Sequence, residues 1–298
     1  MIRIKESELI LNPDGSIYHL NLKPEDISDT ILFVGDQDRV EKITKHFDTI
    51  EFSTQKREFK TQTGTYKGKR ISVISTGIGP DNIDIVLNEL DALINIDFTT
   101  RTIKEKLNSL NTIRIGTSGS LQSDIPVDSF LIGTHGLDLN GMLHFYKLKD
   151  ICNHEIENAF MNHTHWNSNK ARPIAINNSL ELERIFESKQ TYKGITGTAG
   201  GFYGPQGRVL RLAIQDSELN NKMNSFLYNG LRISNLEMET AAIYGLSKLL
   251  GHNAVSLNAI IANRANGTFS KNPAKTIESL ILYTCLLYTS DAADELRS

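Results

Sequence analysis

The sequence is poor in cysteine, has no excess of basic charge and contains no long apolar run. Two cysteines among 298 residues are too few for a disulfide framework and lack the paired spacing of a zinc site. The formal net charge of −3 provides no basic surface for nucleic acid or an anionic membrane. No stretch of about 18 uncharged apolar residues occurs, and charges at Arg3, Lys5, Glu6 and Glu8 argue against a signal peptide. We therefore expect a cytoplasmic globular protein that binds neither nucleic acid nor membranes.

Common cofactor-binding motifs are also missing. No P-loop Gly-Lys-Ser/Thr occurs, and Gly77 and Gly79 are not completed by the third glycine of a dinucleotide fingerprint. The histidines lack an accompanying carboxylate pattern such as His-Glu-x-x-His. The histidines concerned are His135, His144, His154, His163 and His165. A nicotinamide or ATP enzyme is disfavoured, and no metal site is expected.

Short β-rich runs alternate with amphipathic helical patterns along the chain. The strand candidates are residues 31–35, 71–75, 113–116, 130–133 and 254–263. The helix candidates, with apolar residues three and four apart, are residues 38–47, 81–94, 178–188, 216–229 and 238–250. This alternation predicts an α/β fold with a largely buried sheet. No repeat, linker or composition shift divides the chain, so one domain is expected over residues 1–284.

Two segments depart from this alternation. The polar stretch 95–111 predicts an inserted, exposed helix or loop, and the most mobile part of the chain. Residues 285–298 resemble the translation of a sequencing-library adaptor, so we interpret them as a non-native tail appended to a truncated reading frame. The alternative is a native C-terminal helix over residues 276–287. A native stop codon directly after Ser298 at the genomic locus would support the alternative.

Three strand candidates lead into residues suited to anion binding. Gly35 and Arg39 follow the first, where a glycine lets the backbone approach an anion, helix amides point at it and arginine adds a bidentate fork. A glycine-rich turn follows the second at 75–79, and the third leads into 114–119. Because such strand ends share a crevice, one anion site is expected. The alternative is that the glycines only make tight turns and the arginines pair with surface carboxylates.

Taken in order, these motifs resemble the uridine phosphorylase branch of the nucleoside phosphorylase superfamily, from about residue 18 to residue 284. The resemblance implies an α/β single-domain, three-layer fold with a central mixed, barrel-like twisted sheet flanked by helices. Its phosphate-binding positions fall on Gly35, Arg39, Arg114 and Thr117, with Arg57 contributed by a neighbouring subunit.

The resemblance also implies the nucleoside-binding residues. The ribose positions fall on Glu237, Met238, Glu239 and His19, the last reaching the ribose 5′-hydroxyl from a neighbouring subunit. The base positions fall on Thr117, Gly119, Phe202, Gln206 and Arg208, and catalytic roles on Arg114, Gln206, Arg208 and Glu239. A glutamine amide can donate to one uracil oxygen and accept from N3–H, while an arginine donates to the other carbonyl oxygen. The alternatives are a solvated surface histidine at position 19 and helix-dipole partners at positions 237 and 239.

The residues after the last long strand bear on the choice of base. Purine-cleaving bacterial relatives present an aspartate there, whereas this chain has Asn263 and Arg264. The resemblance thus implies a pentosyltransferase of pyrimidine salvage that cleaves uridine, or another pyrimidine nucleoside, with inorganic phosphate to free base and ribose 1-phosphate. A purine nucleoside phosphorylase and a non-catalytic nucleoside-binding protein of the same fold are the alternatives.

Two departures from the family pattern affect loops at the expected site. Gln37 replaces a proline in the first phosphate turn, which is expected to loosen that loop. A monovalent cation can lie near the position of Glu58, but Asn82 stands where a serine ligand is expected, so the cation is left open. No other cofactor is implied.

Shared active sites imply a homodimer as the minimal unit, and a hexamer stays open. The preference among uridine, thymidine and deoxyuridine also stays open.

Overall fold

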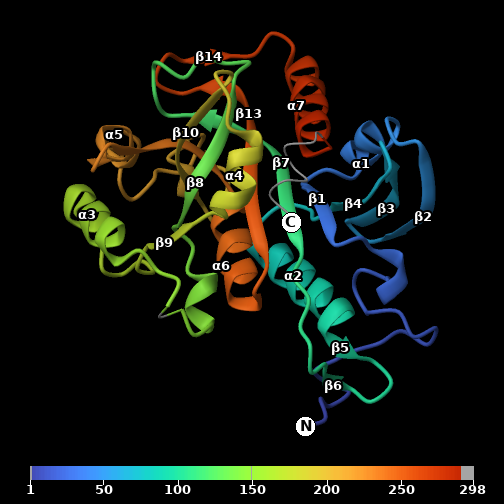
Figure 1. The fold of residues 1–298 in the computed structure, drawn as a ribbon. Coiled ribbons are helices and arrows are strands. Elements are labelled where there is room, and N and C mark those ends of the chain that lie inside the picture. The colour runs from blue at the N-terminus through green and yellow to red at the C-terminus, as the bar shows by residue number, and fades with distance from the viewer. Residues whose placement is uncertain (1, 149, 290–298) are drawn as a thin grey trace.

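The predicted strands form the centre of the protein, which the computed structural model describes for residues 2–148 and 150–289 (Figure 1). The strands are β1 (Thr30–Val34), β2 (Thr49–Lys56), β3 (Phe59–Tyr66), β4 (Lys69–Ser75), β5 (Ile96–Asp97), β6 (Thr102–Ile103), β7 (Asn111–Ser120), β8 (Phe130–Asp138), β9 (Ile174–Asn177), β10 (Thr191–Thr198), β11 (Leu227–Tyr228), β12 (Leu231–Glu237), β13 (Asn253–Asn263) and β14 (Thr268–Phe269). The helices are α1 (Gln37–Thr44), α2 (Pro80–Asn95), α3 (His154–Thr164), α4 (Leu180–Phe186), α5 (Leu219–Ser225), α6 (Thr240–Leu250) and α7 (Pro273–Tyr288). Each predicted strand and helix is present, which confirms the α/β class. The helix predicted over residues 216–229 is shorter, because α5 ends at Ser225 and residues 227–228 form β11.

Strands β7, β8, β10, β12 and β13 close into a ring. β12 pairs with β10, β10 with β8, β8 with β13 and β13 with β7, and β7 pairs back with β12. The pairs β12–β10, β10–β8 and β13–β7 are parallel, and the pairs β8–β13 and β7–β12 are antiparallel. The sheet is therefore mixed. From β7 the sheet continues through β1, β4, β3 and β2 as an open arm. The expected central, mixed, barrel-like sheet is confirmed.

Helices cover both faces of this sheet and create three layers. Successive side chains of a strand point to opposite faces. On β1, Ile31 and Phe33 belong to the apolar core that includes α2 and α6. Leu32 and Val34 belong to a second core that includes α1, α4 and α7. Figure 1 shows α2 and α6 side by side, in agreement with their direct contacts. The three-layer arrangement is therefore confirmed.

The sheet is larger than the sequence pattern predicted. Strands β2, β3, β9, β10 and β12 and helix α3 were not identified from the sequence. β2 is an edge strand of largely exposed and intermediate residues, and β10 is rich in threonine and glycine, so neither has the apolar alternation that marks a strand. The strand predicted at 113–116 extends to Ser120, so Thr117 and Gly119 lie within β7 instead of in a turn after it.

The expected insertion at 95–111 contains a small hairpin instead of a helix. β5 and β6 pair antiparallel, with Arg101 in the left-handed region at φ 57° between them. The Arg101 guanidinium donates to the carbonyls of Ile4 and Leu9, and the Ile4 amide donates to the Arg101 carbonyl at 2.8 Å. The hairpin is thus tied to the N-terminal segment. The exposed-helix alternative is wrong, and the mobility of the segment stays a prediction.

The C-terminal helix continues past residue 284, where the native domain was expected to end. α7 runs to Tyr288, and both Cys285 and Tyr288 are buried. The Tyr288 hydroxyl lies 2.7 Å from Thr30 Oγ1 on β1, and its ring stacks on Phe186 of α4. The helix of the alternative interpretation is therefore present, and residues 285–288 belong to the core. Residues 290–298 lie outside the described residues, and an adaptor origin of the tail stays a prediction.

Replacing Tyr288 with alanine is expected to lower the free energy of unfolding by about 3 kcal/mol or more, because it leaves a cavity between α7, α4 and β1. Leu286 on the same helix is 49% exposed, so Leu286→Ala is expected to change stability by about 0.5 kcal/mol or less. Denaturant unfolding of the two variants measures the difference. Equal stabilities would show that the end of α7 does not contribute to the core.

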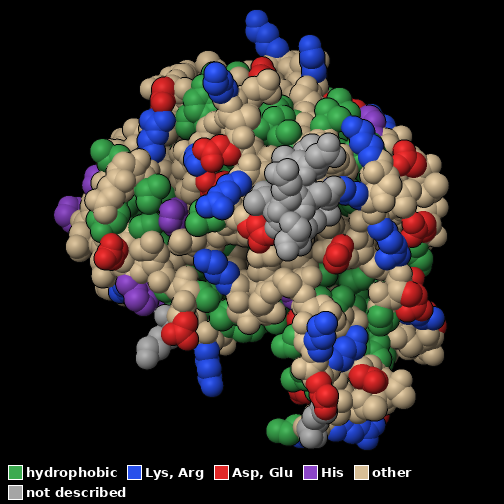
Figure 2. Space-filling view, in the orientation of Figure 1, with side chains coloured by type: hydrophobic (Ala, Val, Ile, Leu, Met, Phe, Trp, Pro, Cys, Tyr) green, Lys and Arg blue, Asp and Glu red, His purple; other side chains and the backbone are tan. Residues whose placement is uncertain are grey.

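The surface of the visible face carries acidic and basic side chains interspersed, without a large patch of one sign (Figure 2). Within residues 2–148 and 150–289, no helix has the length and apolar composition needed to cross a membrane. The same residues contain no group of three or more His, Cys, Asp or Glu side chains arranged to hold a metal ion. Attention therefore moves to the cavities of the protein.

Candidate active site

A cavity of about 710 Å³ opens where strands β1, β4, β12 and β13 end. In α/β sheets, ligands bind outside the carboxyl ends of the strands. The predicted site residues that line this cavity are Gly35, Arg39, Arg114, Thr117, Gly119, Phe202, Gln206, Arg208, Glu237, Met238 and Glu239. The prediction of one shared crevice is therefore confirmed, while the role of each residue in binding stays a prediction.

The turn after β1 places Arg39 at the start of α1. Asp36 caps this helix, because its side chain accepts a 3.0 Å hydrogen bond from the Asp38 amide. Arg39 donates to the carbonyl of Ile115 at 3.2 Å. Burial, and then the positive charge of Arg114, lower the pKa of Arg39. Arg39 forms no ion pair with a carboxylate of the described residues, so its guanidinium can still pair with a ligand. Binding of an anion between Arg39, Arg114 and the start of α1 stays a prediction.

Arg114 lies in the middle of β7 and is almost fully buried. Its Nη2 donates to Glu239 at 2.6 Å and lies 3.1 Å from a Glu237 oxygen, while Nη1 donates to Asn258 at 3.0 Å. Burial alone would lower the pKa of Arg114, but the two glutamates reverse the shift and raise it. Gly116 is required here, because a Cβ at that position would collide with the Arg114 guanidinium. Arg114 is therefore a permanently charged group held in a fixed orientation.

Glu239 lies beside Arg114 and connects it to the turn after β4. One carboxylate oxygen accepts from Arg114, and the other accepts from the Gly79 amide at 2.8 Å. Gly79 has φ 104°, a conformation that strongly favours glycine. Burial raises the pKa of Glu239, although the charge of Arg114 opposes the shift. A carboxylate held in this way has remaining lone pairs that can accept hydrogen bonds from hydroxyl groups of a ligand.

Glu237 has a different local role. Its carboxylate accepts hydrogen bonds from the amides of Glu239 and Thr240 at the start of α6, both at 2.9 Å, and from the Thr198 hydroxyl at 2.7 Å. Such contacts satisfy the unpaired amides of a helix N-terminus. Glu237 is therefore a partner of the α6 N-terminus, as the helix-dipole alternative expects. Its predicted contact with a ribose stays a prediction.

Gln206 and Arg208 form a connected pair in the wall of the cavity. Arg208 Nη1 donates to Gln206 Oε1 and to the Phe202 carbonyl, both at 2.6 Å, and its guanidinium lies 3.8 Å from the centre of the Phe202 ring. Because arginine only donates, the Gln206 oxygen must face it, and Nε2 remains a donor. Burial lowers the pKa of Arg208. These side chains present hydrogen-bond donors in positions fixed by stacking and by each other.

Arg264 lies behind the cavity wall, next to the lining residue Gly119, and it is neither a lining residue nor a predicted site residue. Its side chain packs against Gly119, 3.6 Å from the point where a Cβ would be, and its Nη1 is buried without a partner among the described residues. Burial, and then the charge of Arg208, lower the pKa of Arg264 to about 10. The sequence signal for Arg264 is an arginine directly after a buried strand.

The two residues expected to serve a neighbouring subunit do not line the cavity of their own chain. Arg57 is exposed at the turn between β2 and β3, with φ 55°. His19 precedes the strands, where its ring contacts Glu89 of α2. Both positions are compatible with donation to another subunit, which stays a prediction.

Gln37 connects the first turn to the β2–β3 turn. Its Nε2 donates to the Arg57 carbonyl at 2.7 Å, and its Oε1 accepts from Gln55 at 3.0 Å. The loosening expected from the loss of a proline is therefore opposed by these bonds. Glu58 and Asn82, the residues considered for a monovalent cation, both line the cavity. The Asn82 amide nitrogen is directed at the Ile78 carbonyl at 3.4 Å.

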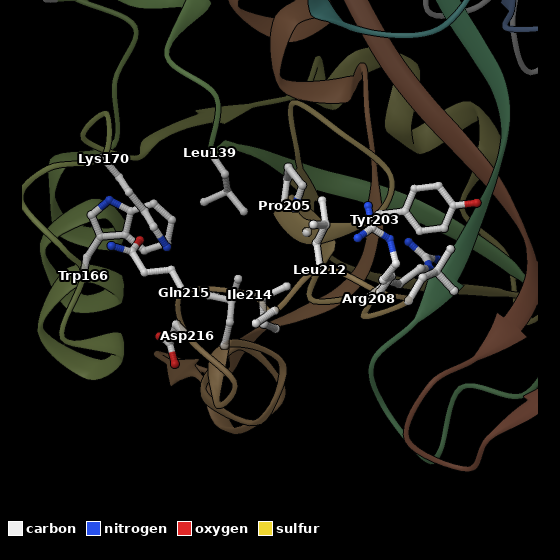
Figure 3. Close-up of a pocket in the computed structure, with 15 residues that line it drawn as sticks. Leu139, Trp166, Lys170, Tyr203, Pro205, Arg208, Leu212, Ile214, Gln215 and Asp216 are labelled. Atoms are coloured by element: carbon white, nitrogen blue, oxygen red, sulfur yellow. The ribbon is translucent and has the colours of Figure 1, made fainter.

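A second cavity of about 710 Å³ lies on the other side of Arg208, and Figure 3 shows the residues that line it. Trp166 and Lys170 lie at one end in that view, and Tyr203 and Arg208 lie at the other. Its lining is largely apolar and comes mainly from residues 203–216. Arg208 contributes to both cavities, so the segment that carries it is the wall between them.

The fold, and a cavity at the strand ends that contains two arginines beside a buried carboxylate, are the features to compare with known classes of protein. The family model described as the Phosphorylase superfamily matches residues 29–280. The chain belongs to this superfamily.

Individual relatives agree with this assignment. The chain is 29% identical over 267 residues to "Uridine phosphorylase" of Thermococcus kodakarensis, covering 87% of this chain and 81% of the relative. It is 26% identical to "Purine nucleoside phosphorylase DeoD-type 2" of Shewanella oneidensis, covering 89% and 95%. A solved Trypanosoma brucei nucleoside phosphorylase, described as showing uridine phosphorylase activity, aligns with a TM-score of 0.84 and 28% identity, covering 94% and 99%. Relatives of both base specificities are therefore similar to this chain.

Proposed function

We propose that this protein cleaves uridine with inorganic phosphate to uracil and ribose 1-phosphate. The observation that carries the proposal is the convergence of Arg39, Arg114 and Glu239 in the cavity that also contains Gln206 and Arg208. The names of the uridine phosphorylase relatives support it. Phosphate is the only co-substrate in this proposal, and a monovalent cation near Glu58 is not required by it.

Glycosidic bond cleavage develops positive charge on the sugar, and here it leaves negative charge on the departing base. Phosphate held by Arg39, Arg114 and the turn at Gly35 would face this sugar as nucleophile and counter-charge, and positioning would supply much of the rate. Glu239 would accept hydrogen bonds from the ribose hydroxyls. Gln206 and Arg208 would stabilise the base as it leaves, because pre-oriented donors act where negative charge develops.

Arg264 adds to the preference for a pyrimidine. A purine phosphorylase of the bacterial type is expected to need an acid after β13. This position holds Arg264, which is half-buried and whose charge interacts with that of Arg208. A cation here suits a carbonyl oxygen that gains negative charge during cleavage. The purine-cleaving relatives make purine nucleosides the second candidate substrates.

We further propose that the active unit is at least a dimer with shared sites. Arg57 and His19 lie outside the cavity of their own chain, while the family resemblance assigns both to a neighbour's site. The Gln37 bond to the Arg57 backbone places this turn next to the lining of the cavity. A third guanidinium would then join Arg39 and Arg114 around the phosphate.

Release of free base from uridine, thymidine and inosine, measured with and without phosphate, tests the proposed reaction. We expect uracil release from uridine that depends on phosphate, with inosine cleaved at least about tenfold more slowly. Faster cleavage of inosine would support the purine alternative. Phosphate-independent release would indicate a hydrolase, and no release would support a binding protein.

A further inference from the structure

Glu89 lies on α2 outside the lining of the cavity and holds the segment that carries His19. Its two carboxylate oxygens each accept from the His19 amide at 3.0 Å, and one also accepts from the Leu20 amide at 2.8 Å. His19 Nδ1 lies 2.6 Å from the other oxygen. The Glu89 side chain is only 13% exposed. Burying a carboxylate is costly unless it is hydrogen-bonded, and here every bond comes from the loop at residues 19–20.

These contacts determine which ring nitrogen of His19 is free. A carboxylate that already accepts from two amides is an acceptor, so the hydrogen bond to His19 requires a proton on Nδ1. In the neutral ring, Nε2 then has a lone pair and accepts hydrogen bonds. Nε2 has no hydrogen-bond partner in residues 2–148 and 150–289, and the ring is 26% exposed. Nε2 is therefore the ring nitrogen that remains available to a ligand.

The loop before His19 is held from a second side. Lys56, the last residue of β2, donates to the Tyr18 carbonyl and to Asn12 Oδ1, and its ammonium lies 4.4 Å from the centre of the Tyr18 ring. The next residue along the chain is Arg57. The loop with His19 and the turn with Arg57 are thus connected, and Glu89 fixes this unit to α2.

We propose that Glu89 is a positioning residue for the phosphorolysis reaction. By binding Nδ1, it orients the ring so that His19 Nε2 is presented to the 5′-hydroxyl of a ribose in a neighbouring site. This inference rests on the proposed function and on His19 reaching that hydroxyl. If Glu89 only anchored the loop, its bonds to the amides of His19 and Leu20 would be enough. The additional bond to the His19 ring sets the orientation and the tautomer of that ring.

The test compares uridine with 5′-deoxyuridine, which lacks the hydroxyl that His19 would contact. We expect the wild-type ratio of kcat/KM for uridine over 5′-deoxyuridine to fall about 3- to 10-fold in Glu89→Gln, the size of one hydrogen bond. His19→Ala is expected to cause the same fall, and the double variant no further fall. Both substrates are assayed on one preparation, so a partly unfolded variant lowers both rates equally and leaves the ratio unchanged.

The matched control is Asn88→Ala, which removes an exposed side chain of α2 that contacts Tyr146 and Asp84 but not His19. Its ratio is expected to equal that of the wild type. If Glu89→Gln does not fold, Glu89→Asp takes its place, because it keeps the charge and shortens the reach to the ring. A ratio unchanged in the Glu89 variant or in His19→Ala would overturn the inference. Wild-type protein that does not cleave uridine would overturn the proposed function itself.

Discussion

Replacing Arg208 with alanine is expected to lower the turnover of uridine by about 10²–10³, the usual cost of losing one donor that stabilises a developing negative charge. The residue lies in the cavity wall, stacks on Phe202 and holds the Gln206 carbonyl at 2.6 Å. Its loss removes a cation from the base end and frees the Gln206 amide to rotate. Steady-state release of uracil at saturating phosphate measures the effect.

Arg211 is the matched control for this substitution. It lies three residues further along the same segment, is exposed, and lines only the second cavity. Arg211→Ala removes the same charge from the same segment, and turnover is expected to stay within about twofold of the wild type. Wild-type turnover in Arg208→Ala would contradict the proposal that this arginine stabilises the departing base. Equal losses in both variants would point to a disturbed segment instead of a lost donor.

Mixing two inactive variants is expected to restore activity if active sites are shared between subunits. Arg57→Ala removes the arginine supplied to the neighbour, and Arg114→Ala removes one supplied within the chain. A mixed dimer then has one intact site, made of Arg114 from one chain and Arg57 from the other. With full random exchange and twofold symmetry, about a quarter of wild-type activity should return.

The control for mixing uses two residues that act within one chain. Arg114 and Glu239 touch each other at 2.6 Å, so Arg114→Ala mixed with Glu239→Ala leaves every site defective and should recover nothing. Subunit exchange is verified by mass spectrometry of tagged chains. An inactive Arg57→Ala and Arg114→Ala mixture with proven exchange would contradict shared sites. A fully active Arg57→Ala protein would also contradict shared active sites.

The three arginines differ in how far the sequence predicts their positions. Arg39 is predictable because a glycine turn and a helix start are local features, and the structure places it there. Arg114 falls in the strand predicted over residues 113–116 and lies inside the longer strand β7, where Gly116 leaves room for its guanidinium. Arg264 was overlooked, since nothing local shows that the residue after β13 packs against Gly119.

The C-terminal segment illustrates the opposite error. A resemblance to an adaptor concerns the origin of residues 285–288 and does not predict whether they pack in the core. The apolar residues of this segment nevertheless continue the buried face of α7, with Cys285 and Tyr288 in the core beside α4 and β1. A helix packs by the spacing of its side chains, whatever their source.

The α/β class is predictable from the sequence alone, because hydrophobic periodicity and turn residues act over a few neighbours along the chain. The site motifs are predictable only through their resemblance to the family. Only the tertiary structure decided that Arg114 contacts Glu239, 125 residues away, and that Glu89 holds His19, 70 residues away. Such contacts follow from strand order, ring closure and helix placement. These depend on the packing of the whole chain, so no local pattern encodes them.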